Sequence, residues 1–303
     1  MHAYSDSTMG PAPIDEQASI VYLEWQELYE SEKPFQVFAD VPQGFHGRLT
    51  NLVFAPAPPL EIRDLRGRED AYTLDANGFR LVRNRMPAFD LSTKESMESN
   101  VVPYLEDLVT KHVDGADFVR CFDWGFRKNV EMTMPKMDVN DKMQMLNPGK
   151  QAHCDQSPAG ALGRLQYHAP EMVERAERLR IINLWRPLNH PAKDNTLAVC
   201  DGSTIVATDL VEADHISSTY LGSTVYGLYS PKHRWHYLRH QTPEEVFLIK
   251  IFDSDPDVNA ECSLHAAFDY THVPEDALPR ESLEMRFLVV SISEKDRSKD
   301  DRD

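Results

Sequence analysis

The stretch PEEVFLIKIFDS, from Pro243 to Ser254, decides the fold of this chain. Within it, Glu245–Phe252 is rich in branched and aromatic apolar residues, with Lys250 as the one charge between its ends, which is typical of a buried β-strand. The residues that follow, Asp253–Asp257, favour a loop because Asp and Pro are common in turns. This part of the chain predicts a β-rich core with polar turns between its strands.

Five further short runs of the same character lie around this strand and are also separated by turn residues. With it they make six strands within about 110 residues, which predicts an antiparallel sandwich or barrel. The five runs are Leu179–Trp185, Thr196–Val199, Thr224–Tyr229, Arg234–Leu238 and Leu283–Val290.

The rest of the chain is more mixed and favours helices packed on the outside of such a barrel. Apolar spacing predicts a helix over Val101–Val113, with Gly115 as its stop, and a short helix over Pro170–Arg178. Ile14–Tyr29 fits a helical face and a strand equally well, so both stay open.

Length and composition favour one globular domain. The chain has 303 residues, 41% hydrophobic and 27% charged, and a β-barrel enzyme of this length commonly forms a single domain. We expect that domain over residues 14–292, after a loose leader over residues 1–13. Ser293–Asp303 (SEKDRSKDDRD) is expected to be a charged tail without chemistry.

Charge and targeting signals restrict the partners. A formal charge of -17 argues against nucleic acid and anionic membranes, which bind clustered Lys and Arg. Met1–Asp15 has no signal-peptide pattern, and the chain has no apolar run of roughly 18 residues, so we expect a cytoplasmic protein that does not enter membranes. The four cysteines are widely spaced without a CxxC pair, which indicates neither a disulfide framework nor a thiolate zinc site.

A metal-ligand pair lies in the segment QAHCDQ. His153 and Asp155 are two positions apart, and in an extended strand such positions project from the same face, so both can bind one ion. Two His and one carboxylate would leave three positions on Fe(II) for a 2-oxo acid and dioxygen. The third ligand must come from elsewhere in the chain, and His265 and His233 are the candidates.

A second pattern, RESLEMR, opens the last predicted strand at Arg280. Its residues alternate between a polar face, which can line a pocket, and an apolar face, which can pack. A 2-oxo diacid needs its distant carboxylate held, and Arg280 can bind it as a fork while Ser282 adds a hydroxyl donor. Arg286 lies on the same face by period two and is the alternative anchor.

Eight stretches carry a family resemblance: EIRDLRG at Glu61, TLDANGF at Thr73, HCDQS at His153, RIINLWRPL at Arg180, HRWHYL at His233, PEEVFLIKIFDS at Pro243, HAAF at His265 and RESLEMR at Arg280. They resemble the iron and 2-oxoglutarate oxygenases that include the cephamycin methoxylation subunit and fungal gibberellin desaturase-like hydroxylase/desaturases. The resemblance covers roughly Ile62–Val290 and implies a mainly β fold, a double-stranded β-helix (jelly-roll, cupin-like) core with flanking helices.

The implied activity is Fe(II)- and 2-oxoglutarate-dependent oxidation of a small specialised metabolite, with O2 consumed and succinate and CO2 as co-products. Hydroxylation, desaturation and oxidative cyclisation all occur in that family. Its order of strand, distal His and final strand opening with Arg-x-Ser favours His265 over His233 as the third iron ligand. The residues expected to bind the co-substrate are Arg280, Ser282, Arg286, Asn183 and Arg186, and those expected to contact substrate are His233, Trp235 and Gln156.

One position departs from the family pattern, because His236 stands where the family usually has Tyr. We expect His236, His240 and His272 to lie on the surface or in loops. Two other classes of function stay open. A zinc hydrolase could use the same three ligands but would give Arg280 and Ser282 no role. A non-catalytic β-barrel binding protein would make the His and Asp pair incidental.

Overall fold

The computed structural model of this chain describes residues 13–38, 45–129, 141–217, 221–271 and 273–293. Most of the expected leader, the expected tail beyond Ser293 and the expected loop residue His272 lie outside the described residues.

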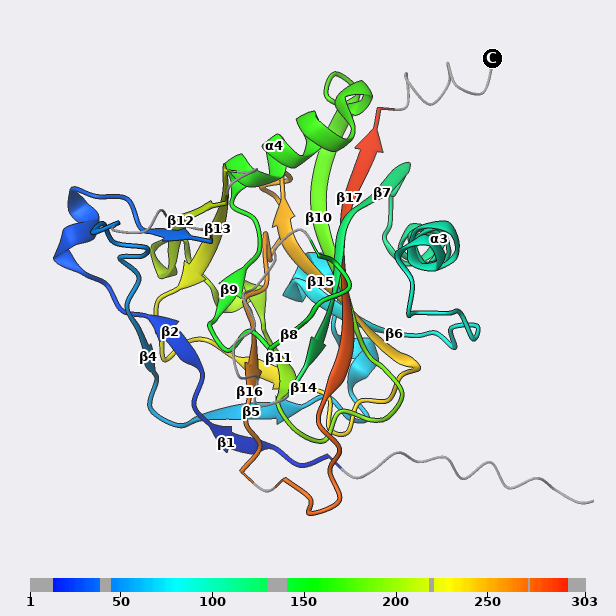
Figure 1. Cartoon of the computed structure of the whole chain (residues 1–303), viewed down its shortest axis with the longest axis horizontal. Coiled ribbons are helices and arrows are strands. Elements are labelled where there is room, and N and C mark those ends of the chain that lie inside the picture. Colours follow the sequence, from blue (N-terminus) through cyan, green and yellow to red (C-terminus); the bar gives the residue numbers. More distant parts are fainter. Residues whose placement is uncertain (1–12, 39–44, 130–140, 218–220, 272, 294–303) are drawn as a thin grey trace, which may run out of the picture.

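Two sheets face one another and form the body of the molecule (Figure 1). The six-stranded sheet has the order β6 (Phe79–Arg83), β15 (Glu245–Asp253), β10 (Ala176–Pro187), β17 (Glu281–Ile292), β7 (Phe118–Lys128) and β8 (Met145–Leu146). The nine-stranded sheet has the order β1 (Glu16–Ala18), β5 (Leu60–Asp64), β14 (Trp235–Tyr237), β11 (Thr196–Cys200), β16 (His265–Phe268), β9 (His153–Cys154), β13 (Leu221–Gly227), β12 (Leu210–Ile216) and β3 (Phe35–Val37).

Most neighbouring strands are antiparallel, and the arrangement is the double-stranded β-helix expected from the sequence. All six predicted strands are present, as β10, β11, β13, β14, β15 and β17. A small third sheet pairs β2 (Val21–Leu23) with β4 (Phe54–Pro56). The open alternative over Ile14–Tyr29 is resolved in favour of β1 and β2, followed by a 3-10 turn over Glu27–Glu30.

β17 illustrates how the two faces of the six-stranded sheet differ. Its odd-numbered residues, from Leu283 to Val289, are fully buried in a core that the sheet shares with helix α3 (Val102–His112). Leu288 and Val290 instead join the core between the two sheets. The predicted alternation of a packing face and a pocket face is therefore confirmed along this strand.

Helix α3 covers the outer face of the six-stranded sheet (Figure 1). The predicted helix over Val101–Val113 is confirmed as α3, which follows a π-helical turn over Met97–Val101. The helix ends at His112, and its C-cap Val113 is already extended, so the expected stop at Gly115 comes two residues too late. Gly115 has a φ of 65°, a left-handed conformation that favours glycine in the turn after the helix. The remaining short elements are α1 (Leu74–Asn77), α2 (Lys94–Ser96) and 3-10 turns over Glu69–Ala71, Gly202–Thr204 and Ala207–Asp209.

The prediction of a helix over Pro170–Arg178 is wrong. Only a 3-10 turn over Pro170–Met172 forms there, and β10 begins at Ala176. The helix lies earlier, as α4 (Pro158–His168), where the Ser157 side chain accepts a hydrogen bond from the Gly160 backbone N–H and caps the helix. A Cβ on Gly160 would lie 3.0 Å from the Ser223 carbonyl oxygen, so this glycine permits the close packing of α4 on β13.

The expectation that His236 lies on the surface is also wrong. Its side chain is 2% exposed and packs against Tyr72 and Phe79, with ring centroids 4.8 and 5.7 Å away. Burial is the main cause that lowers the pKa of His236 to about 4. Within the described ranges of the chain, no helix is long and apolar enough to span a membrane.

We predict that replacing His236 by Phe makes the protein less sensitive to acid. The ordinary pKa of His is 6.5, so the unfolded chain takes up a proton before the folded one does. Stability contributed by the neutral ring is therefore present above pH 6.5 and is lost as the pH falls toward 4. Between pH 7.5 and 5, wild type should lose about 1–2 kcal/mol more unfolding free energy than His236→Phe.

Denaturant unfolding of both proteins at the two pH values measures this difference. An equal loss of unfolding free energy in the two proteins would contradict a buried, neutral His236.

Candidate metal centre

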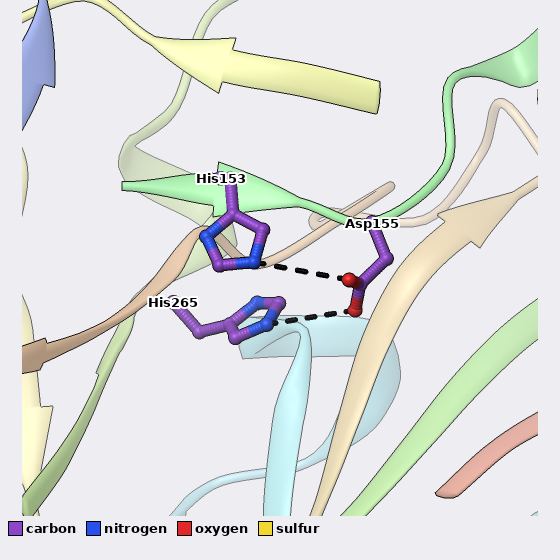
Figure 2. A group of neighbouring side chains, drawn as sticks. All are labelled: His153, Asp155 and His265. Carbon is purple, nitrogen blue, oxygen red and sulfur yellow. Dashed lines mark ion pairs between the residues drawn. The ribbon is translucent and has the colours of Figure 1, made fainter. Parts of the chain in front are cut away.

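Three side chains that could bind a metal meet between the two sheets (Figure 2). His153 lies on β9 and pairs directly with His265 on β16, and Asp155 follows at the end of β9. One ligand atom from each residue lies within 4.8 Å of the others. The Asp155 oxygens are 3.8 Å from His153 Nε2 and 3.7 Å from His265 Nε2. Sheet pairing thus brings a residue more than a hundred positions away beside the HxD segment.

The protonation of these groups suits metal binding. Burial, followed by the nearby His153, lowers the pKa of His265 to about 4, so its imidazole is neutral at pH 7. Burial alone would raise the pKa of Asp155, but Arg286 and the two imidazoles outweigh it and hold that pKa well below its usual range. His153 Nδ1 lies 2.7 Å from the Gln151 carbonyl oxygen, which accepts its N–H and leaves Nε2 as the ligand atom.

This donor set fits a divalent metal. Two imidazoles and one carboxylate, with open positions left around the ion, are typical of non-haem Fe(II) oxygenases. Cys154 lies between His153 and Asp155 in the sequence but is not part of the cluster. Its side chain is buried, and its thiol donates a hydrogen bond to the Ser263 carbonyl oxygen. His153, Asp155 and His265 can therefore hold iron.

A small cavity adjoins the cluster and contains a buried cation. Arg280 is 2% exposed, and its guanidinium lies over the Trp185 ring and donates from Nη1 to the Asn195 carbonyl oxygen at 2.6 Å. No carboxylate of the described chain lies within ion-pair distance of it. Burial, the largest cause, lowers the pKa of Arg280 to about 9. The cavity is lined by Arg127, Gly149, His153, Asn183, Trp185, Leu197, Ile249, His265, Ala267, Arg280 and Glu284.

Further polar atoms beside Arg280 are buried and unused. Arg280 Nε and Ser282 Oγ find no hydrogen-bond partner among the residues that the structure describes. Ser282 is fully buried and lies two positions after Arg280, at the start of β17, although it is not among the residues that line the small cavity. Since unpaired buried donors cost free energy, this group of donors fits an anionic ligand such as a carboxylate.

Asn183 and Arg286, both expected to bind the co-substrate, contact the carboxylate of Asp155 instead. Asn183 Nδ2 donates to Asp155 Oδ2, and Arg286 Nη2 donates to Asp155 Oδ1 at 2.9 Å. Asn183 also lines the small cavity, whereas Arg286 lines a second, larger one.

Arg186, expected to bind the co-substrate, does not line the small cavity. Alternation along β10 directs Asn183 and Trp185 toward the cavity and Arg186 toward the opposite face, where it is cross-strand partner of Leu283. There its guanidinium donates to the Pro243 carbonyl oxygen and to Asn84 Oδ1. Arg186 is a buried structural residue of the outer face.

His233 and Trp235, the other expected substrate contacts, lie away from the metal cluster and its two cavities. His233 has both ring nitrogens engaged, each at 3.1 Å, with Asp209 Oδ2 and the Tyr22 hydroxyl. Trp235 is fully buried and donates from Nε1 to the same hydroxyl. Neither residue lines the two cavities, and His233 is not in the metal cluster.

The larger cavity has a volume of about 740 Å³ and reaches the metal cluster at His153 and Asp155. Gln156, an expected substrate contact, lines it. The sequence did not single out its other walls, which come from β7, α4, β12 and β13. They include Phe122, Asp123, Arg127, Arg164, His168, His215 and Tyr226. Strand β7 could have been found from the alternation of Phe122, Trp124 and Phe126 with polar residues.

Comparison with known proteins finds similar sequences over most of the chain. A family model described as "Oxidoreductase/YMDC permease-like domain" matches residues 20–290. The chain is 32% identical over 242 residues to Fe(II)/2-oxoglutarate-dependent dioxygenase nvfI of Aspergillus novofumigatus, which covers 76% of this chain and 82% of that protein. It is 30% identical over 253 residues to hydroxylase/desaturase efuI of Hormonema carpetanum, with coverage of 76% and 83%.

A solved structure is similar over nearly the whole chain. It is titled iron and alpha-ketoglutarate-dependent endoperoxidase NvfI and superposes with a TM-score of 0.76 at 26% sequence identity. The match covers 92% of this chain and 99% of that one.

We predict that His265, and not His233, is needed for metal binding. Co(II), which absorbs visible light in such sites, should bind wild type and His233→Asn but bind His265→Asn at least about 100-fold more weakly, because a direct ligand is lost. Titration of Co(II) against visible absorbance measures both affinities, and thermal unfolding of each variant checks its fold. Loss of Co(II) binding in folded His233→Asn, with retention in His265→Asn, would reverse the assignment.

Proposed function

This chain belongs to the Fe(II)/2-oxoglutarate-dependent dioxygenases, and on that premise we propose that His153, Asp155 and His265 hold the iron while Arg280 and Ser282 anchor 2-oxoglutarate. The oxidised substrate is a small organic molecule, a specialised metabolite, held in the larger cavity beside the metal. Fe(II), 2-oxoglutarate and O2 are the cofactor and co-substrates of this family.

The observation that carries the proposal is that Arg280 is buried and has no carboxylate of the described residues within ion-pair distance. A guanidinium without a counter-charge is costly inside a protein, so a ligand carboxylate is expected to complete this cavity. 2-Oxoglutarate has a carboxylate at each end. One end carries the 2-oxo acid that suits the metal cluster, and the other suits the fork of Arg280. A zinc hydrolase would leave this cation without a role.

Iron supplies the activation of dioxygen when it is bound. The protein holds the ligand atoms in place and excludes water from the site. Sheet pairing fixes His153 against His265, so the ligand atoms are held by the backbone ladder of the two strands. Trp185 lies over Arg280 and, with Leu197 and Ile249, surrounds the co-substrate cavity with apolar groups that exclude water.

The larger cavity supports a small-molecule substrate. Its volume of about 740 Å³ is in the range of sites for drug-sized ligands. Aromatic side chains such as Phe122 and Tyr226 can pack on an apolar skeleton, and Gln156, Ser223 and Thr224 can bond to its oxygen atoms. The cytoplasmic location expected from the sequence, and the expectation that nucleic acid and membranes are not partners, stay predictions.

We predict iron-dependent formation of succinate from 2-oxoglutarate by the wild-type protein. Arg280→Gln should raise the KM for 2-oxoglutarate by roughly 30-fold or more, because it removes one partner of a buried charge pair. Asp155→Ala should abolish turnover. Arg186→Gln is the matched control, since Arg186 is equally buried but lies on the outer face of the sheet.

Succinate released from protein loaded with Fe(II) under nitrogen and then exposed to oxygen gives the rate. An unchanged KM in Arg280→Gln would remove Arg280 as anchor. Absence of both turnover and the visible band of the Fe(II)–2-oxoglutarate complex in wild type would overturn the proposed function.

A further inference from the structure

One cross-strand pair reaches the carboxylate of Asp155 from the opposite sheet. Asn183 on β10 and Arg286 on β17 are direct partners in the antiparallel ladder, so their side chains lie next to each other on the inner face. Both donate to Asp155, which lies at the end of β9 in the other sheet. Each oxygen of the carboxylate therefore has its own donor, Nδ2 of Asn183 for Oδ2 and Nη2 of Arg286 for Oδ1.

Arg286 is itself held by three acidic side chains. Its Nη2 also lies 3.0 Å from Glu284 Oε1, and its Nη1 lies 2.9 Å from Asp123 Oδ2. Glu284 in turn binds Arg127 Nη2 at 2.7 Å. The Arg286 side chain is 12% exposed, so these contacts are shielded from solvent. Its planar guanidinium is fixed in orientation before any ligand enters.

Arg280 and Arg286 therefore differ although they share one strand face. Arg280 has no carboxylate of the described chain within ion-pair distance, whereas the donors of Arg286 are already bound to Asp155, Glu284 and Asp123. A co-substrate carboxylate at Arg286 would have to displace one of these groups, while at Arg280 it would displace none of the described ones.

We propose that Arg286 is a positioning residue of the iron centre, which with Asn183 clamps both oxygens of Asp155 and sets the affinity for the metal. This inference rests on the proposed function. A carboxylate with a donor on each oxygen cannot rotate freely, and each oxygen keeps a lone pair for the ion. The clamp holds the carboxylate edge toward the two imidazoles, at 3.7 and 3.8 Å, and balances its charge in a buried site.

The test compares metal affinity with co-substrate affinity in three arginine variants. Arg286→Gln should weaken Co(II) binding by about 10- to 100-fold, the usual effect of losing an outer-shell partner of a metal ligand. Its KM for 2-oxoglutarate, measured at saturating Fe(II), should stay within about twofold of wild type. Arg280→Gln should show the reverse pattern, and Arg186→Gln should change neither value.

Arg286→Lys keeps the charge but offers a compact ammonium instead of a planar fork, so it should restore only part of the Co(II) affinity. If Arg286→Gln does not fold, Arg286→Lys and Asn183→Ala carry the same test, because each weakens one arm of the clamp. Co(II) is titrated under nitrogen by its visible absorbance, and thermal unfolding checks each variant.

Wild-type Co(II) affinity in folded Arg286→Gln, or in both substitute variants, together with a raised KM for 2-oxoglutarate, would make Arg286 a co-substrate residue and overturn the inference. Failure of the proposed function looks different. In that case wild type itself would bind no Co(II), or would bind it but show neither succinate formation nor the visible band with Fe(II) and 2-oxoglutarate.

Discussion

The constraint on which the site depends is the pairing of β17 between β10 and β7 in the six-stranded sheet. Because side chains alternate along a strand, this pairing places Ser282, Glu284 and Arg286 inside the barrel as soon as Leu283 and Met285 pack outside. A slip of one residue would exchange the two sets, burying charges against α3 and exposing the apolar side chains to the cavity. The apolar core between the six-stranded sheet and α3 therefore fixes the strand register that places the polar side chains of β17 inside the barrel.

The opposite sheet supplies the metal ligands through equally local rules. β9 is only two residues long, yet it pairs with β16 on one side and β13 on the other, so His153 is fixed between two neighbours. Asp155 lies just past the strand, where the backbone no longer determines its position. That is the ligand which receives side-chain support from across the barrel, from Asn183 and Arg286. Hydrogen bonds from side chains therefore hold Asp155 at the point where the backbone hydrogen bonds of β9 end.

Sequence patterns predicted the strands and the HxD segment with its partner His265, because period-two alternation and local spacing record which residues share a face. They could not place side chains whose surroundings depend on distant parts of the chain. His233 and Trp235 lie in a conspicuous motif, but Tyr22 and Asp209 hold them in place far from the cavity. The sequence could not show which face of the sheet Arg186 occupies, because that follows from the pairing of β10 with β17. Helix α4 was not predicted because glycine has a low helix propensity and α4 contains Gly160 and Gly163. In the structure, close packing against β13 at Gly160 stabilises this helix.

Arg280 and Arg286 show how far identical chemistry can diverge on one strand face. The sequence offers two guanidinium groups six positions apart and no means to rank them. Their surroundings separate them. Three carboxylates around Arg286 make it part of the protein's own charge network, whereas Arg280 has no carboxylate of the described residues within ion-pair distance, which suits the proposed role of anchor for an anionic ligand. In a chain with a net charge of -17, a cation can recognise an anionic co-substrate only if nearby acidic side chains are bound elsewhere. Beside Arg280, Trp185 supplies an apolar surface, and Glu284, which lines the same cavity, is bound by Arg127 and Arg286. The carboxylate of Asp194 accepts the backbone N–H of Arg280.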